Sequence, residues 1–215
     1  MHKIIKQKEL TYIKYKFLAR AILNNELIIG PSDTVYGLYT VPTKKSVKKI
    51  IKFKGRDYNK PVSVFMYNIQ HANKFIKYKS HIDFISNLLK KDTKYTFIVK
   101  ASAYAIKTLP RPIITDSKTI GIRIIRHEFI TNIFMGMQKA FNKLMPITAT
   151  SANISNTMPY CDFNLLTKSI PKNKLKYIKH LIDYGKLQKC NNLSPHASTL
   201  IDISKGLKNI RFIKR

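Results

Sequence analysis

The chain has 215 residues, 44% hydrophobic and 11% aromatic, a composition that excludes a disordered protein and suits one folded domain. No apolar run approaches the ~20 residues of a membrane-spanning helix, and no apolar core of a signal peptide follows the N-terminus. Forty Lys and Arg against 11 Asp and Glu give a net charge of +29. This excess favours a polyanionic partner such as RNA, but a compositional bias toward surface lysine explains it equally well.

Apolar periodicity predicts alternating helices and strands. Helices are expected over 10–22, 47–54, 84–89 and 129–137. Short apolar runs predict strands at 27–29, 62–67, 95–101, 119–125, 147–150, 177–182, 198–203 and 210–213. Segments 110–118 and 187–197 are predicted loops. The pattern predicts one α/β domain over residues 1–215, a twisted mixed sheet with flanking helices.

Two polar segments follow or adjoin these elements. PSDTVYGL (31–38) leaves a short strand and is either a pocket for a polar ligand or a turn. Lys54, Arg56 and Lys60 place three cations within seven residues beside Gly55, which could hold a triphosphate. Because the chain has 40 basic residues, a chance cluster on a solvent-exposed face explains these three cations more simply than a triphosphate site does.

Two later strands carry further candidates. Arg123 lies between isoleucines in TIGIRI, so it needs an anion, either a bound carboxylate or a structural ion-pair partner. The scarcity of acids favours the bound ligand. TATSANIS (148–155) offers small hydroxyl and amide groups suited to phosphate or ribose, or it forms a simple turn. The chain lacks both the P-loop and the dinucleotide fingerprint, and Cys161 and Cys190 have neither metal-ligand spacing nor a disulfide framework.

Taken in order, six segments resemble the YrdC-like threonylcarbamoyl-AMP synthase family. They are PSDTVYGL, KGRDYNKP, YTFIVKA, TIGIRI, ATSANIS and STLIDIS, and with the final Ile210-Arg211 the resemblance spans residues 27–211. It implies a single YrdC-like domain with a concave basic cavity. The implied activity is that of a nucleotidyltransferase, which forms threonylcarbamoyl-AMP and pyrophosphate from L-threonine, bicarbonate and ATP for N6-threonylcarbamoyladenosine modification of tRNA position 37.

The resemblance also implies the site residues. Its ATP-binding positions are Lys54, Arg56, Lys60, Thr119, Ser151, Asn153 and Ser198. Its threonine-binding positions are Thr34, Arg123 and Ala149. It implies no dedicated catalytic residue, no tightly bound cofactor, and Mg²⁺ that arrives with ATP rather than on protein side chains. The implied partners are tRNA or another RNA and the downstream tRNA threonylcarbamoyl-transferase machinery, in the cytoplasm and away from membranes.

The sequence departs from the family pattern at a few positions. Ser32 replaces the first motif threonine, Phe65 stands where a histidine is common, and Asn156 replaces a glycine. A different class of function, a non-catalytic RNA-binding module of the same fold, would need the charge but not the specific set Thr34, Arg123, Ser151 and Asn153. Retention of that set favours the enzyme.

Overall fold

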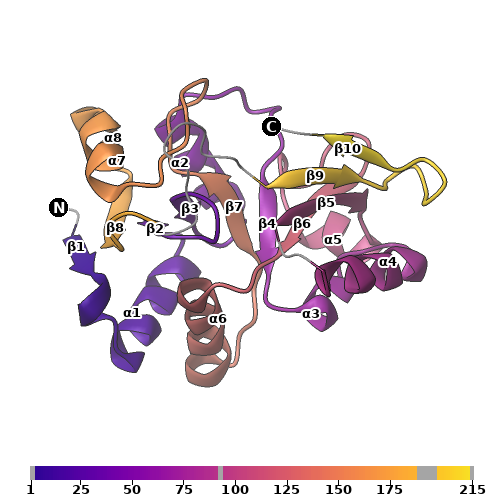
Figure 1. Ribbon diagram of the computed structural model, residues 1–215, viewed down its shortest axis with the longest axis horizontal. Coiled ribbons are helices and arrows are strands. Elements are labelled where there is room, and N and C mark those ends of the chain that lie inside the picture. Colours follow the sequence, from indigo (N-terminus) through magenta and orange to yellow (C-terminus); the bar gives the residue numbers. More distant parts are fainter. Residues whose placement is uncertain (1–2, 92–93, 188–197, 214–215) are drawn as a thin grey trace.

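The computed structural model describes residues 3–91, 94–187 and 198–213 (Figure 1). Its strands are β1 (Lys3–Lys6), β2 (Leu27–Gly30), β3 (Gly37–Tyr39), β4 (Ser63–Met66), β5 (Tyr95–Lys100), β6 (Thr119–Ile124), β7 (Ile147–Ser151), β8 (Ile178–Asp183), β9 (Thr199–Asp202) and β10 (Arg211–Ile213). Its helices are the 3-10 turn η1 (Gln7–Glu9), α1 (Tyr12–Leu23), α2 (Lys44–Lys54), α3 (Ile69–Asn73), α4 (Lys79–Leu89), α5 (Ala103–Thr108), α6 (Glu128–Phe141), α7 (Phe163–Ser169) and α8 (Lys172–Leu175).

The strands form one mixed sheet in the order β1-β8-β2-β3-β7-β4-β6-β5-β9-β10. Strand pairs β4/β6 and β5/β9 are parallel, whereas β3/β7, β4/β7 and β5/β6 are antiparallel. Figure 1 shows α1 and α6 together below the middle of the sheet, α2, α7 and α8 near its β8 end, and α3, α4 and α5 near β4, β6 and β5. The predicted α/β fold with a mixed sheet and flanking helices is confirmed.

Local signals explain where the helices begin and end. The Thr11 side chain accepts a hydrogen bond from the backbone N–H of Lys14 and so begins α1. Thr43 and Ser46 form a reciprocal cap at the start of α2. Gly55 ends α2 in the left-handed conformation, with φ 58° and ψ 41°. Glycine adopts this conformation without steric cost, so the chain can turn sharply between Lys54 and Arg56.

Three apolar clusters hold the helices against the sheet. One joins β4, β5 and β6 to α3–α5, with Phe97 and Ile122 fully buried. A second joins α1 and α6 to β2, β3 and β7 around Phe129. A third packs α2 and α7 on β2 and β3 around Phe53. Because each cluster spans elements far apart in sequence, the packing fixes the relative positions of the polar strand ends.

Most predicted elements are confirmed, including all four helices, all eight strands and the loop at 110–118. The prediction missed β1, β3, α3, α5, α7 and α8, which are too short for a reliable periodic pattern. The loop predicted at 187–197 lies, from residue 188 onward, outside the described residues. Cys161 is disulfide-bonded, so the expectation of no disulfide was wrong. Within the described ranges, no helix is long and apolar enough to cross a membrane.

Candidate active site

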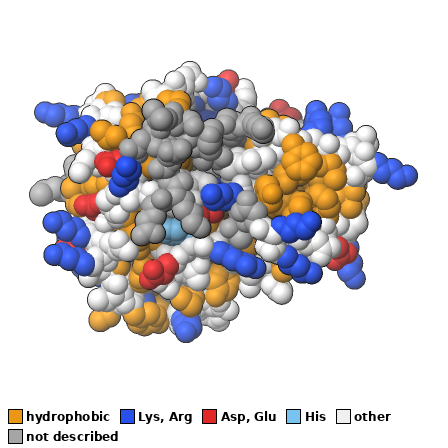
Figure 2. Space-filling model, in the orientation of Figure 1, with side chains coloured by type: hydrophobic (Ala, Val, Ile, Leu, Met, Phe, Trp, Pro, Cys, Tyr) orange, Lys and Arg blue, Asp and Glu red, His pale blue; other side chains and the backbone are white. Residues whose placement is uncertain are grey.

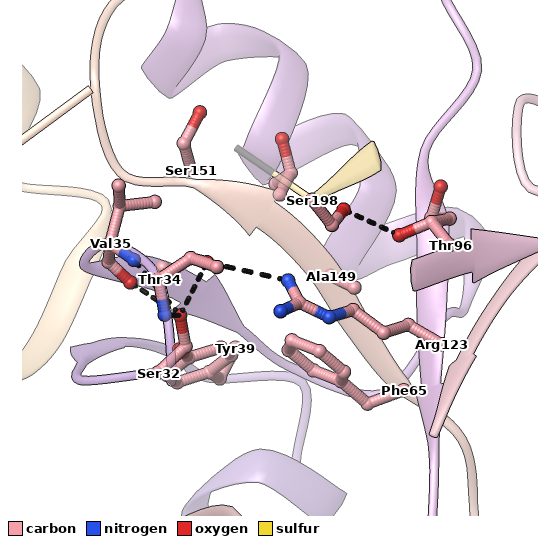
Figure 3. A pocket seen from close by; sticks show the side chains of 13 residues that line it. Ser32, Thr34, Val35, Tyr39, Phe65, Thr96, Arg123, Ala149, Ser151 and Ser198 are labelled. Atoms are coloured by element: carbon pink, nitrogen blue, oxygen red, sulfur yellow. Dashed lines mark hydrogen bonds between the residues drawn. The ribbon is translucent and has the colours of Figure 1, made fainter. Parts of the chain in front are cut away.

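A cavity of about 70 Å³ lies on the sheet where β3, β7, β4 and β6 run side by side (Figure 3). The strand register puts small side chains on this face, since Gly37 pairs with Ser151 and Ser63 pairs with Ala149. Successive residues of a strand point to opposite faces, so Gly121 and Arg123 share one face of β6. The lining is mainly hydroxylated, and Arg123 is its one charged side chain within the part of the chain described.

Gly121 leaves room for the Ser63 side chain on this face. A Cβ atom at this position would come within 2.4 Å of the Ser63 Oγ atom and 3.1 Å of its Cβ atom. We therefore expect Gly121→Ala to lower the free energy of unfolding by about 1–3 kcal/mol, measured by chemical denaturation. The double variant Ser63→Ala/Gly121→Ala removes the nearest atom and should recover part of that loss; equal losses in the two variants would contradict the proposed clash.

The segment after β2 forms a rigid turn at the cavity. The Ser32 hydroxyl accepts hydrogen bonds from the backbone N–H groups of Thr34 (3.1 Å) and Val35 (3.2 Å), and donates to the Val35 carbonyl (2.7 Å). The Tyr39 hydroxyl donates to the Pro31 carbonyl at 2.9 Å. Serine in place of threonine at position 32 thus retains the hydroxyl that organises the turn, and Thr34 lines the cavity.

Arg123 is held by three partners and is only 5% exposed. Its Nη2 atom lies 2.5 Å from Asp33 Oδ1, and Nη1 donates to Thr34 Oγ1 at 3.4 Å. The guanidinium carbon lies 5.7 Å from the centre of the Phe65 ring. Arg123 therefore has a structural ion-pair partner, one of the two alternatives that the sequence left open. Phe65, which stands where a histidine is common in the family, packs against the Arg123 guanidinium (Figure 3).

Lys54 anchors the turn that follows β7. Its buried ammonium donates to the carbonyls of Ser151 (2.6 Å) and Asn153 (2.7 Å), and the Ser155 N–H donates to the Lys54 carbonyl at 2.9 Å. Burial, with a smaller contribution from Arg56, lowers the pKa of Lys54 to about 7, although the surrounding carbonyl oxygens favour its charged form. The Lys54 side chain thus holds the turn by its contacts with the backbone carbonyls of the turn.

The ten predicted site residues divide into three groups. Five line the cavity: Thr34, Arg123, Ala149, Ser151 and Ser198. Two, Lys54 and Asn153, are joined to Ser151 by the contacts just described. The remaining three, Arg56, Lys60 and Thr119, neither line the cavity nor share those contacts.

The three outlying residues have different surroundings. The Arg56 Nη2 atom donates to the Pro61 carbonyl at 3.2 Å, and Lys60 is exposed. The Thr119 hydroxyl lies 2.6 Å from the Thr115 hydroxyl. Thr119 is four residues before Arg123 and lies on the same face of β6.

Sequence reasoning missed three residues with direct contacts at the site: Tyr39 and Thr96 line the cavity, and Asp33 pairs with Arg123. Asp33 lies inside the PSDTVYGL motif but was given no role, although the scarcity of acids could have drawn attention to it. Tyr39 belongs to the unpredicted strand β3. The Thr96 hydroxyl lies 2.6 Å from that of Ser198, a pairing across 102 residues that strand alternation alone does not reveal.

A larger hollow of about 400 Å³ adjoins the cavity and shares Ser32 and Thr34 with it. Asp33, Arg126 and His127 also line this hollow. Burial lowers the pKa of His127, against the opposite influence of Asp33 and Glu128. Figure 2 shows Lys and Arg side chains scattered over the visible face instead of gathered into one patch.

Comparison with known proteins places this geometry in a family. The Sua5_yciO_yrdC family model, described as "Telomere recombination", matches residues 20–212. A protein of Methanocaldococcus jannaschii, provisionally named a threonylcarbamoyl-AMP synthase, is 31% identical over 208 residues, 94% of this chain and 88% of that protein.

Two solved structures share the fold. The first is P. abyssi Sua5 complexed with L-threonine, with a TM-score of 0.73 and 22% identity over 94% of this chain and 54% of that one. The second is E. coli YciO, with a TM-score of 0.76 and 13% identity over 100% of this chain and 95% of that one. The present chain thus spans about half of that Sua5 chain and nearly all of YciO. Together with the match over residues 20–212, the motifs and the sheet show that the chain belongs to the Sua5/YciO/YrdC family.

Proposed function

We propose that the chain is an L-threonylcarbamoyladenylate synthase, which uses L-threonine, bicarbonate and ATP. The observation that carries this proposal is the buried Arg123 guanidinium among hydroxyls, next to the turn at Ser151 that Lys54 anchors. The provisional name of the M. jannaschii relative and the L-threonine in the Sua5 complex support the choice of substrate and product.

The proposed reaction has two steps. The threonine amine attacks the carbon of bicarbonate, forming an N–C bond and releasing water, which leaves a carbamate. A carbamate oxygen then attacks the α-phosphorus of ATP, and the bond to pyrophosphate breaks. Both steps bring anions together, so positioning and charge neutralisation contribute more than a protein nucleophile would.

The residues divide this work by location. Arg123 would take the flat carboxylate of threonine, since its fork matches two oxygens, with Thr34 and the small Ala149 beside it. Ser151, Asn153, Ser198 and Thr119 would contact the nucleotide, and Arg56 and Lys60 its phosphates. We propose that Mg²⁺ enters on the phosphate oxygens of ATP, as it commonly does in nucleotide-using enzymes.

The product would pass to a tRNA threonylcarbamoyl-transferase for modification of position 37. The net charge of +29 fits contact with tRNA but does not identify the surface that makes it. The test is incubation with ATP, threonine and bicarbonate, followed by detection of pyrophosphate and the adenylate. Pyrophosphate that requires all three substrates supports the synthase; RNA binding without any pyrophosphate would favour the non-catalytic RNA-binding module instead.

We expect Arg56→Ala to weaken ATP binding, because loss of one charge-assisted hydrogen bond costs about 1.5–3 kcal/mol. This corresponds to an increase in Kd of roughly 10- to 150-fold, measured by calorimetry. The matched control is Lys48→Ala, which removes one positive charge from an exposed position of α2. Parent-like ATP binding by Arg56→Ala would assign the cation cluster to a solvated face.

A further inference from the structure

The buried ion pair between Asp33 and Arg123 is incomplete on both sides. Asp33 Oδ1 contacts Arg123 Nη2 at 2.5 Å, but the other carboxylate oxygen, Oδ2, is buried without a hydrogen-bond partner among the described residues. Arg123 Nε is likewise buried and unpaired in that part of the chain. Buried polar atoms are rarely left unsatisfied, so an unused acceptor on one member of the ion pair and an unused donor on the other indicate a ligand that supplies both.

The position of Asp33 gives it access to such a ligand. Asp33 lies between Ser32 and Thr34, which line the cavity and the adjoining hollow alike, and Asp33 itself lines the hollow. Its side chain is only 13% exposed, and that of Arg123 only 6%. The other charged groups lining the hollow are Arg126, Glu128 and Lys186. Asp33 is the acid paired directly with Arg123, so a ligand held by both needs opposite charges close together.

We propose that Asp33 recognises the ammonium group of the amino-acid substrate while Arg123 recognises its carboxylate. An α-amino acid carries these two groups on one carbon atom, which suits an adjacent acceptor and donor. This proposal rests on the proposed function and extends it: the Asp33–Arg123 pair selects α-amino acids over acids that lack the amine. Asp33 is then a specificity-determining residue of the threonine site.

Two other roles for Asp33 make different predictions. If Asp33 only orients Arg123, its loss weakens every ligand that carries a carboxylate. If Asp33 instead occupies the place of the substrate carboxylate, its loss strengthens binding, because a competitor has been removed. Both can be separated from ammonium recognition by comparing threonine with an analogue that has no amine.

The experiment measures Kd by calorimetry, without ATP, for L-threonine and for 2,3-dihydroxybutanoate, whose second hydroxyl replaces the amine. The parent should prefer threonine. Asp33→Asn should raise the Kd for threonine about 10- to 100-fold, which is the range for loss of a hydrogen bond to a charged group. The Kd for the analogue should stay within about twofold of the parent value. The control Asp116→Asn, in the exposed ion pair with Arg111, should change neither value.

Equal weakening of both ligands, or tighter binding of threonine, would overturn the proposal. If Asp33→Asn does not fold, the parent protein still decides: equal affinity for threonine and the analogue overturns it. Threonine binding without pyrophosphate in the full assay would reject the synthase while leaving this assignment intact. If the parent binds no threonine, alanine against lactate tests the same selection for an amine, and absence of any preference overturns it.

Discussion

Arg123→Met should lower the free energy of unfolding by about 3–5 kcal/mol, because it leaves the Asp33 carboxylate buried without its cation. The measurement is chemical denaturation of parent and variant. The control is Asp33→Asn/Arg123→Met, in which no unpaired charge remains; it should be more stable than Arg123→Met alone. A double variant as unstable as the single one would show that packing against Phe65, and not the ion pair, carries the effect.

Arg123→Lys separates stability from substrate recognition. Lysine keeps the positive charge but loses the fork, so we expect a higher KM for threonine and a nearly unchanged KM for ATP. The ion pair with Asp33 adds a second expectation, a lower melting temperature. A loss of stability without a selective effect on threonine would reject the carboxylate role of Arg123 and leave only its structural one.

Lys54→Met should raise the KM for ATP at least tenfold, because the carbonyls of Ser151 and Asn153 lose the donor that holds their turn. Lys49→Met is the matched control: Lys49 lies in the same helix and bonds to the Asn25 carbonyl and Glu26, away from the cavity. Steady-state kinetics with varied ATP measure both. A parent-like KM in Lys54→Met would show that the turn keeps its shape without the ammonium.

The difference in stability between the parent and Lys54→Met should depend on pH. The pKa of Lys54 is lowered from 10.5 to about 7, so the unfolded chain binds more protons between these values. The stability of the parent should therefore rise with pH in this window relative to Lys54→Met, by at most about 1.4 kcal/mol per pH unit. Burial raises the pKa of Tyr36, Tyr39 and Tyr184, so the comparison should end near pH ~9.5, before tyrosine ionises in the unfolded chain.

The sequence by itself determined the longer elements and the polar segments that meet at the site. Periodic apolar residues predicted α1, α2, α4 and α6, and short apolar runs predicted β2 and β4 to β10. The PSDTVYGL and ATSANIS segments pointed to the strand ends that form the cavity. These signals are local, since side-chain spacing, capping and turn residues act within a few positions of the chain.

Only the tertiary structure decided how the polar groups pair. The contact of Asp33 with Arg123 spans 90 residues, and that of Lys54 with Ser151 spans 97. Both follow from strand register and buried packing, which local sequence patterns do not specify. The sequence left open whether Arg123 binds a ligand or an internal acid, because burial and register decide which anion reaches it. The fold supplies Asp33 and leaves one oxygen of that acid and one nitrogen of the arginine unpaired within the described chain.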